Sequence, residues 1–438
     1  MAGVNRENRN SFSRARVTLV LSLLLLALKL FSQSPRLVEQ LYSNTVFPFL
    51  VTGLDRLNSR TILSISEIGI LLFLFILSII TVKLLITLGS GFRQGLPAAL
   101  RSSLTLLNLL LGVVLVGYVL WGLNYSRPPL DERIDWAQAE VRPLVSDREE
   151  LGRLAVETIR WANHFYRLSQ GHVDTGEPSH LPESFGSLDE SLNSGMAGAS
   201  AWLGLPAGLR GPMGPAKPLI SSRLMSYLGL SGFYSPWTGE ANFNDRVPDC
   251  ELPIVIAHEK AHQRGFAGED EASFAGFLAC LYSDSLYARY SAYLFAQREL
   301  LREWMRLAPR EAQASGLERL PGVQRDLEAV GRFWNRYRGV AWEVTSSVND
   351  AYLKLHRVKG GILSYQGSAR LLVLLGRHQG GFLSPPAAGS QNAAPSRPLQ
   401  PQPGTGSVVS RRARPTSANA VIGHRVRSLR AGRPVAGS

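Results

Sequence analysis

Three apolar segments near the N-terminus are each expected to form a membrane-spanning helix. They cover residues 17–31, 68–88 and 104–123. The second and third are long enough to cross a bilayer. The first is shorter and follows a basic stub, residues 1–16, so a cleaved signal peptide is its alternative. No small-x-small cleavage site follows it, which favours an uncleaved span and an anchor over residues 17–123.

Aromatic residues near the end of the third segment are typical of a membrane interface. Tyr118 and Trp121 lie in its last turns, and Tyr125 follows just beyond it. Such side chains prefer the headgroup region. We therefore expect the chain to leave the membrane here.

Beyond the anchor, apolar residues recur at helical spacing. The pattern predicts helices over residues 146–168, 253–264, 269–282, 292–306, 323–352 and 369–375. Residues 186–215 are rich in Gly, Ser, Ala and Pro, which predicts loops with at most short helices. Two strand-like stretches within residues 217–244 flank Pro236 and Gly239, which predicts a β-hairpin.

The expected fold class is mostly α. A three-helix transmembrane anchor is followed by an α+β domain, residues 124–380, with a small hairpin or sheet. From residue 381 to 438 the composition changes to Pro, Gly, Ser, Ala and Arg. Such a segment buries too little apolar surface to offset its ordering entropy, so disorder is expected.

The basic charge of the chain fits a membrane surface better than a nucleic acid. The formal net charge is +13, and many arginines lie in the stub, the short connections and the tail. The loop 89–103 carries Arg93 and Arg101 and no acid. Basic loops favour the cytoplasmic side, so three spans place the domain outside the cytoplasm. The lipid bilayer is the expected partner, and nucleic acid is not.

The segment from residue 253 to 275 contains a metal-binding motif. His258, Glu259 and His262 form His-Glu-x-x-His. On a helix, residues i and i+4 share a face, so both imidazoles can reach one Zn²⁺ while the glutamate deprotonates a bound water. Pro253 suits a first helical turn, and Gly265 suits a left-handed residue that ends the helix.

A third ligand is expected from the next helix. Glu269 is the first choice, because Ser273 follows one turn later and could hydrogen-bond a ligating histidine. Glu271 is the alternative. Acidic residues at a helix N-terminus also stabilise its dipole without any metal.

Other residues are candidates for contact with substrate. An edge strand of the hairpin could bind an extended peptide, with Glu240 and Asn242 close to it, although ordinary sheet structure explains them equally well. Tyr352 and His356, one helical turn apart, could donate a hydrogen bond to an oxyanion. Cys250 and Cys280 do not form a metal-binding pair and are expected to be buried thiols.

From Trp121-Gly-Leu-Asn-Tyr125 onward the chain resembles an uncharacterised family of bacterial membrane-anchored proteins regarded as zinc metallopeptidases. The matching stretches are residues 233–244, 258–274 and 352–365, and with the anchor the resemblance covers residues 17–380. It implies a zincin-like domain in which His258, His262 and Glu269 bind zinc and Glu259 is the base. One departure is Ser273, where an Asn is more usual.

The sequence therefore predicts a multi-pass protein of a bacterial cell membrane with a zinc-dependent hydrolase domain outside the cytoplasm. Its expected substrates are peptides or proteins. The alternative is a membrane-tethered structural or sensory protein whose zinc site is not catalytic.

Overall fold

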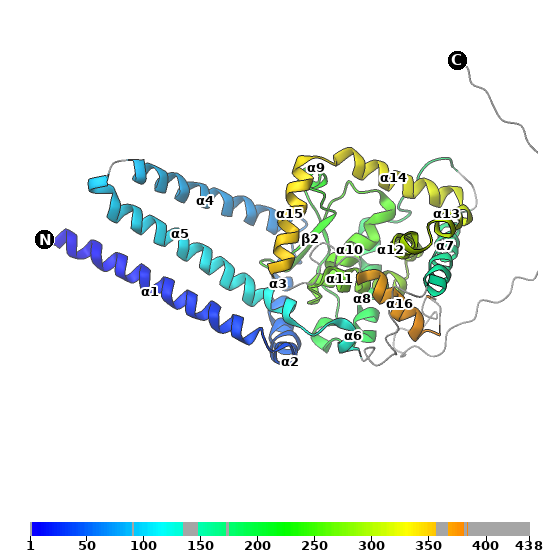
Figure 1. The fold of residues 1–438 in the computed structure, drawn as a ribbon, viewed down its shortest axis with the longest axis horizontal. Helices are drawn as coiled ribbons and strands as arrows, with labels where there is room; N and C mark the ends of the chain where they lie inside the picture. The colour runs from blue at the N-terminus through cyan, green and yellow to red at the C-terminus, as the bar shows by residue number, and fades with distance from the viewer. Residues whose placement is uncertain are drawn as a thin grey trace, which may run out of the picture. The chain divides into compact units, whose positions relative to one another are not determined.

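The structure is a computed structural model that describes residues 2–89, 92–134, 148–171, 175–355, 367–380 and 383. All of these residues fall within one compact unit. The described residues are mostly helical with one small three-stranded sheet, which confirms the mostly α fold class in outline (Figure 1).

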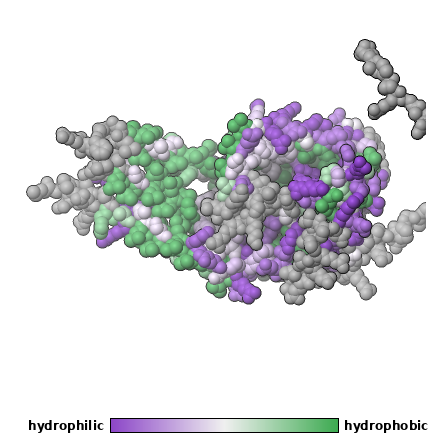
Figure 2. All heavy atoms as spheres, viewed as in Figure 1, coloured by the Kyte–Doolittle hydropathy of each residue, from purple (hydrophilic) through white to green (hydrophobic). Residues whose placement is uncertain are grey.

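Among the described residues, two helices are each long and apolar enough to cross a membrane. They are α4, Ile65–Gly89, and α5, Phe92–Leu120. The helix α1, Ala2–Phe31, meets the same criterion only together with residues 35–58, at a bend of 100°. Thr18 of α1 donates a 2.7 Å hydrogen bond to Asn108 of α5. Figure 2 shows hydrophobic residues gathered over these helices, as expected of surfaces that face lipid.

Residues 32–61, which connect the first two predicted spans, are largely helical. They form α2, Pro35–Leu37, the π-helix η1, Val38–Val46, and α3, Phe47–Asn58. The buried side chains of Tyr42 and Phe47 belong to the same hydrophobic core as the domain beyond the anchor. Glu39 accepts a hydrogen bond of 2.6 Å from Arg127. This segment is therefore part of the structure that supports the domain.

The core of the domain is a set of packed helices: α7 (Arg148–Gln170), α8 (Phe185–Trp202), α10 (Leu252–Gln263), α11 (Glu269–Tyr282) and α12 (Leu286–Leu307). The loop prediction for residues 186–215 is wrong over α8. Gly195 there lets α8 approach α11 closely, because a Cβ at Gly195 would lie 2.1 Å from the carbonyl oxygen of Ala279. The glycines of α8 indicated turns in the sequence but serve close helix packing in the structure.

The sheet contains β1 (Lys217–Pro218), β2 (Gly232–Ser235) and β3 (Glu240–Phe243) in the order β1-β3-β2. Strands β2 and β3 are antiparallel, with Phe233 opposite Asn242, while β1 runs parallel to β3. The predicted hairpin is confirmed, and Gly239 closes it with a positive φ of 71°. Strand β2 is one edge of the sheet.

Shorter helices complete the described fold. They are η2 (Gly122–Ser126), α6 (Leu130–Arg133), η4 (Ala207–Leu209), α9 (Ser222–Tyr227), η5 (Asp249–Glu251), α13 (Pro309–Ser315), η6 (Gly316–Glu318), α14 (Pro321–Tyr337), α15 (Val340–Leu355) and α16 (Gly367–His378). The predicted stretch 323–352 is thus two helices, α14 and α15. Cys250 and Cys280 are free, buried thiols, as expected. The predicted disorder of residues 381–438 falls outside the described residues apart from Leu383.

Candidate metal centre

The motif His-Glu-x-x-His lies on α10, as the sequence predicts. Proline occupies the first turn of this helix, and Gly265 follows its end with φ of +87°. The two histidines therefore share one face. Their ring centroids are 4.6 Å apart, and the rings are perpendicular.

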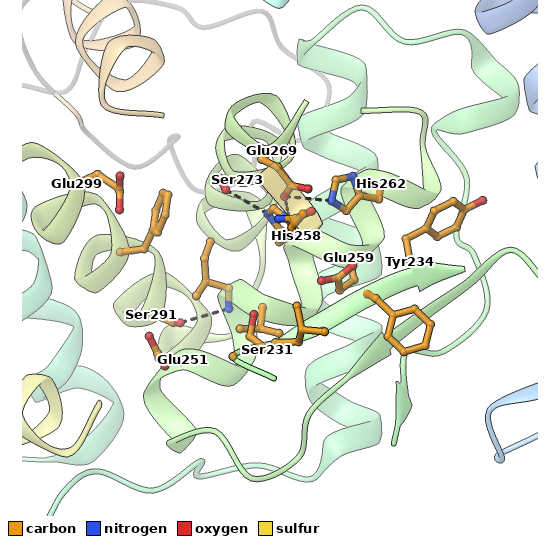
Figure 3. Close-up of a pocket in the computed structure, with 18 of the residues that line it drawn as sticks. Ser231, Tyr234, Glu251, His258, Glu259, His262, Glu269, Ser273, Ser291 and Glu299 are labelled. Carbon is orange, nitrogen blue, oxygen red and sulfur yellow. Dashed lines mark hydrogen bonds and ion pairs between the residues drawn. The ribbon is translucent and has the colours of Figure 1, made fainter. Parts of the chain in front are cut away.

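Glu269, the first residue of α11, faces both imidazoles. Its Oε2 lies 3.1 Å from Nε2 of His258 and 3.6 Å from Nε2 of His262 (Figure 3). One ligand atom from each of these three residues falls within 4.8 Å of the other two. Gly276 permits this approach, because a Cβ there would lie 2.9 Å from the backbone nitrogen of His258. Close packing of α11 on α10 thus brings a carboxylate to the two histidines.

Glu271 points elsewhere. It accepts a 2.8 Å hydrogen bond from the backbone nitrogen of Leu130 and forms an ion pair with Arg133. Of the two acids that the sequence left open, the structure therefore brings Glu269 to the histidines.

Hydrogen bonds orient both imidazoles. Nδ1 of His262 lies 2.6 Å from the carbonyl oxygen of Phe266. A carbonyl oxygen only accepts, so Nδ1 carries a hydrogen. Nε2 is then the nitrogen that donates to Glu269 when protonated and that is free to bind a metal when deprotonated. Nδ1 of His258 lies 3.1 Å from the hydroxyl of Ser273. Ser273 is thus the partner of a histidine, as its spacing from Glu269 suggested.

The charges of these three groups are strongly coupled. Burial lowers the pKa of His258. Burial also acts to lower the pKa of His262, but the Glu269 carboxylate more than offsets it and raises that pKa to about 9. Burial acts to raise the pKa of Glu269, whereas hydrogen bonds from the two imidazoles hold it well below its ordinary value. The ionised carboxylate of Glu269 is therefore stabilised by the positive charge of a protonated imidazole. A bound metal ion could supply that positive charge in place of the proton.

Glu259 lies beside this cluster in a different environment. Its side chain is 4% exposed, and burial raises its pKa to about 8. Its Oε2 is buried and has no hydrogen-bond partner among the described residues. A buried carboxyl without a partner is costly, and such groups are characteristic of functional sites. Its raised pKa suits a group that accepts a proton near neutral pH.

A cavity of 530 Å³ lies against the cluster. His258, Glu259 and Glu269 line one part of it, and Tyr234 of β2 lies nearby in Figure 3. Charged residues line the part formed by η5 and α12: Glu251, Arg298, Glu299 and Arg302. The cavity is large enough for several residues of a peptide or another small substrate.

Trp121 and Tyr234 are cavity residues that the sequence analysis did not assign to the site. Trp121 is only 6% exposed, so its ring packs inside the protein and not among lipid headgroups. Its ring contacts His262 edge-on at 5.9 Å and Tyr234 at 4.8 Å between centroids. The hairpin prediction could have pointed to Tyr234, since it lies on the edge strand.

Two predicted substrate contacts have other roles in the structure. Asn242 is fully buried in the central strand, donates a 3.1 Å hydrogen bond to the carbonyl oxygen of Glu240, and does not line the cavity. Glu240 accepts hydrogen bonds from Ile65 and Ser66 at the start of α4. Both were misplaced because the sequence does not tell which side of a strand faces a neighbouring helix.

The two oxyanion candidates cannot be placed beside the cluster. Tyr352 belongs to α15, but its side chain lies outside the described residues, as does all of His356. The same helix contributes Asn349 to the lining of the cavity.

No curated protein and no solved structure matches the chain. A family model described as "Protein of unknown function (DUF3810)" matches residues 42–373. The match begins in η1 and ends in α16, so it contains α4, α5, the sheet and every residue of the candidate metal cluster. The chain therefore belongs to the DUF3810 family.

Proposed function

We propose that this protein is a membrane-anchored zinc-dependent hydrolase and that its substrates are peptides or proteins. One observation carries the proposal. His258, His262 and Glu269 offer ligand atoms within 4.8 Å of one another, next to a buried glutamate oxygen that has no partner among the described residues.

The donor set fits a catalytic zinc ion. Two imidazole nitrogens and one carboxylate oxygen are typical ligands of catalytic zinc, and they leave a fourth position for water. When bound, zinc lowers the pKa of that water to about 7 and polarises the scissile carbonyl. Ser273 and the carbonyl of Phe266 hold the imidazoles in orientation for this ligation.

Glu259 is the proposed general base. It takes a proton from the attacking water and transfers it to the nitrogen of the leaving amine as the carbon–nitrogen bond breaks. Its burial and its raised pKa, about 8, favour a carboxyl group that holds this proton between the two transfers. The edge strand β2, which lines the same cavity, is the proposed binding site for an extended peptide backbone.

The arrangement of elements supports a zincin-like domain. The motif helix α10 contacts β2 and β3, a left-handed glycine follows it, and the next helix supplies the glutamate. The arginines of the predicted loop 89–103 support a cytoplasmic position for that loop and an extracytoplasmic position for the domain.

The alternative is a zinc site that only braces the fold. The large cavity and the partnerless carboxyl of Glu259 favour catalysis, because a structural site is closed by a fourth protein ligand.

The full chain in nanodiscs tests the proposal. We expect Glu259→Gln to retain one zinc ion per chain and to lose hydrolysis of a peptide library, as followed by mass spectrometry. Equal hydrolysis by Glu259→Gln and by wild type would refute the role of Glu259. A hydroxamate inhibitor should bind the zinc-loaded protein, whereas failure to bind would favour the structural alternative.

A further inference from the structure

The cavity wall is continuous with a candidate membrane helix. Trp121 directly follows α5, whose apolar window covers residues 100–120. Its ring contacts the ring of His262 at 5.9 Å between centroids. Tyr125 also lines the cavity and packs edge-on against Trp121. A residue of the metal-binding cluster therefore lies one side chain away from the end of a membrane span.

The hairpin beside the cluster is fixed to both candidate spans. Glu240 of β3 accepts hydrogen bonds of 3.0 and 2.7 Å from the backbone nitrogens of Ile65 and Ser66, in the first turn of α4. In the turn of the same hairpin, the ring of Trp237 lies 3.1 Å from where a Cβ of Gly117, in α5, would be. These contacts fix the distance between β2 and the ends of the two candidate spans.

An ion pair without solvent exposure strengthens this attachment. Lys217 of β1 pairs with Glu240, and their side chains are 1% and 0% exposed. Lys217 also donates hydrogen bonds of 3.0 and 3.2 Å to the carbonyl oxygens of Asn58 and Leu63, just before α4. Breaking such a pair leaves an uncompensated buried charge, so the sheet and the start of α4 are expected to move as one body.

With α4 and α5 across a bilayer, these contacts would hold the cluster close to the bilayer surface. His262 is separated from the end of the apolar window, at Leu120, by its ring contact with Trp121 and by one residue of the chain. This separation is about 10 Å. Each headgroup layer is about 5–8 Å thick. An extended chain advances about 3.3 Å per residue, so about three residues connect the end of a span to the cluster.

Exposed apolar side chains surround the same end of the spans. Ile62, just before α4, is 86% exposed, and Ile220 is 82% exposed. The backbone nitrogen of Ile220 donates a 2.9 Å hydrogen bond to Glu67 of α4, so Ile220 lies beside the first turn of that span. Phe49 of α3 is 80% exposed. Transfer of such side chains from water to lipid is favourable, which would hold this face of the domain on the bilayer.

We infer that the site acts on polypeptides that are themselves inserted in the membrane, at peptide bonds about two to five residues outside a span. This inference rests on the proposed function and specifies its substrate class. The reaction is simple hydrolysis: water adds to the carbonyl carbon, the carbon–nitrogen bond breaks, and the amine leaves with a proton. A substrate held in the same bilayer reaches an effective concentration far above that of a free peptide.

The test uses the zinc-loaded full chain in proteoliposomes with synthetic single-span peptides. One peptide set carries a randomised segment directly after the span, and a second set carries it after a 20-residue Gly/Ser spacer. A third set is the same segment without a span. We expect the first set to be cleaved at least about tenfold faster than the other two, at bonds within five residues of the span.

The outcomes separate this inference from the proposed function. Equal Glu259-dependent cleavage of all three sets would overturn the inference and leave the hydrolase proposal standing. If no set is cleaved faster by wild type than by Glu259→Gln, the hydrolase proposal fails and the substrate inference fails with it.

A matched pair of surface variants tests the membrane contact. Ile62→Ser combined with Ile220→Ser should slow cleavage of the first set and leave cleavage of the span-free set unchanged. Leu317→Ser is the control, because Leu317 is equally exposed, at 88%, but lies on η6. Equal effects of the two variants would contradict a bilayer contact at Ile62 and Ile220.

Labelling tests the depth without any activity. Bimane attached to Ile62→Cys or Ile220→Cys should be quenched by brominated lipids, whereas bimane at Leu317→Cys should not. Equal quenching at the three positions would overturn the placement of the site at the bilayer surface.

Discussion

Gly232 of β2 lies directly against the side chain of Glu259. A Cβ at Gly232 would come 2.7 Å from Oε1 of Glu259 and 2.7 Å from the backbone oxygen of Asn242. Real Cβ atoms do not approach other atoms this closely, so any larger residue must displace the glutamate or the strand. The edge strand and the motif helix therefore meet at the proposed general base.

Gly232→Ala should impair catalysis through this contact. We expect kcat to fall by about a hundredfold, because small displacements of a catalytic group have effects of this size. Zinc content should stay at one ion per chain, since Gly232 contacts no proposed ligand. The control is Gly331→Ala, because a Cβ at Gly331 meets nothing within 4 Å. An unchanged kcat in Gly232→Ala would contradict a role for the position of Glu259.

Glu269 and Glu271 offer a matched pair of substitutions two residues apart. Glu269→Gln removes a proposed ligand and should weaken zinc binding by more than about 100-fold. Loss of a residue that only hydrogen-bonds a ligand costs about 10- to 100-fold. Glu271→Gln instead weakens the ion pair with Arg133. The side chain of Arg133 is 8% exposed and that of Glu271 is 16% exposed. It should lower stability by about 3 kcal/mol and leave zinc affinity unchanged. Competition titration with a zinc chelator and thermal unfolding measure the two effects, and similar zinc affinities in both variants would exclude Glu269 as a ligand.

Burial of Glu259 predicts a pH-dependent stability of the metal-free protein. Its pKa is raised from 4.5 to about 8 in the folded state, so the folded state holds this proton more tightly than the unfolded state does. Stability from this group is therefore present below pH 4.5 and is lost progressively as the pH rises toward 8.

Glu259→Gln should remove this slope. At pH 8 the glutamine variant should be more stable than wild type by about 4 kcal/mol, and the difference should vanish near pH 4.5. Thermal unfolding with a chelator present, measured for both proteins across this range, provides the comparison. A difference independent of pH would mean that Glu259 does not titrate as its burial implies.

Local signals in the sequence predicted the two helices of the candidate metal centre well. A proline in the first turn of α10, Gly265 after it and the acidic start of α11 are short-range signals, and the structure has the helices at these places. The spacing of Ser273 from Glu269 also predicted its contact with His258. These features depend on helical periodicity alone, which a sequence displays directly.

Features that depend on tertiary contacts were not predictable. No element was predicted between the first two spans, yet Glu39 there pairs with Arg127 and Phe47 packs on Trp121. Gly195 lies in a glycine-rich stretch that is typical of turns, but in the structure it allows close packing of α8 on α11. Trp121 and His262 are in contact although they lie 141 positions apart in the sequence. No local pattern encodes such a contact.

Anomalous scattering at the zinc edge, from crystals of the full chain grown with equimolar zinc, tests the central claim most directly. We expect one ion bonded to Nε2 of His258, Nε2 of His262 and a carboxylate oxygen of Glu269, with its fourth position facing the cavity beside Glu259. No ion at these three residues, or a protein side chain in the fourth position, would contradict it.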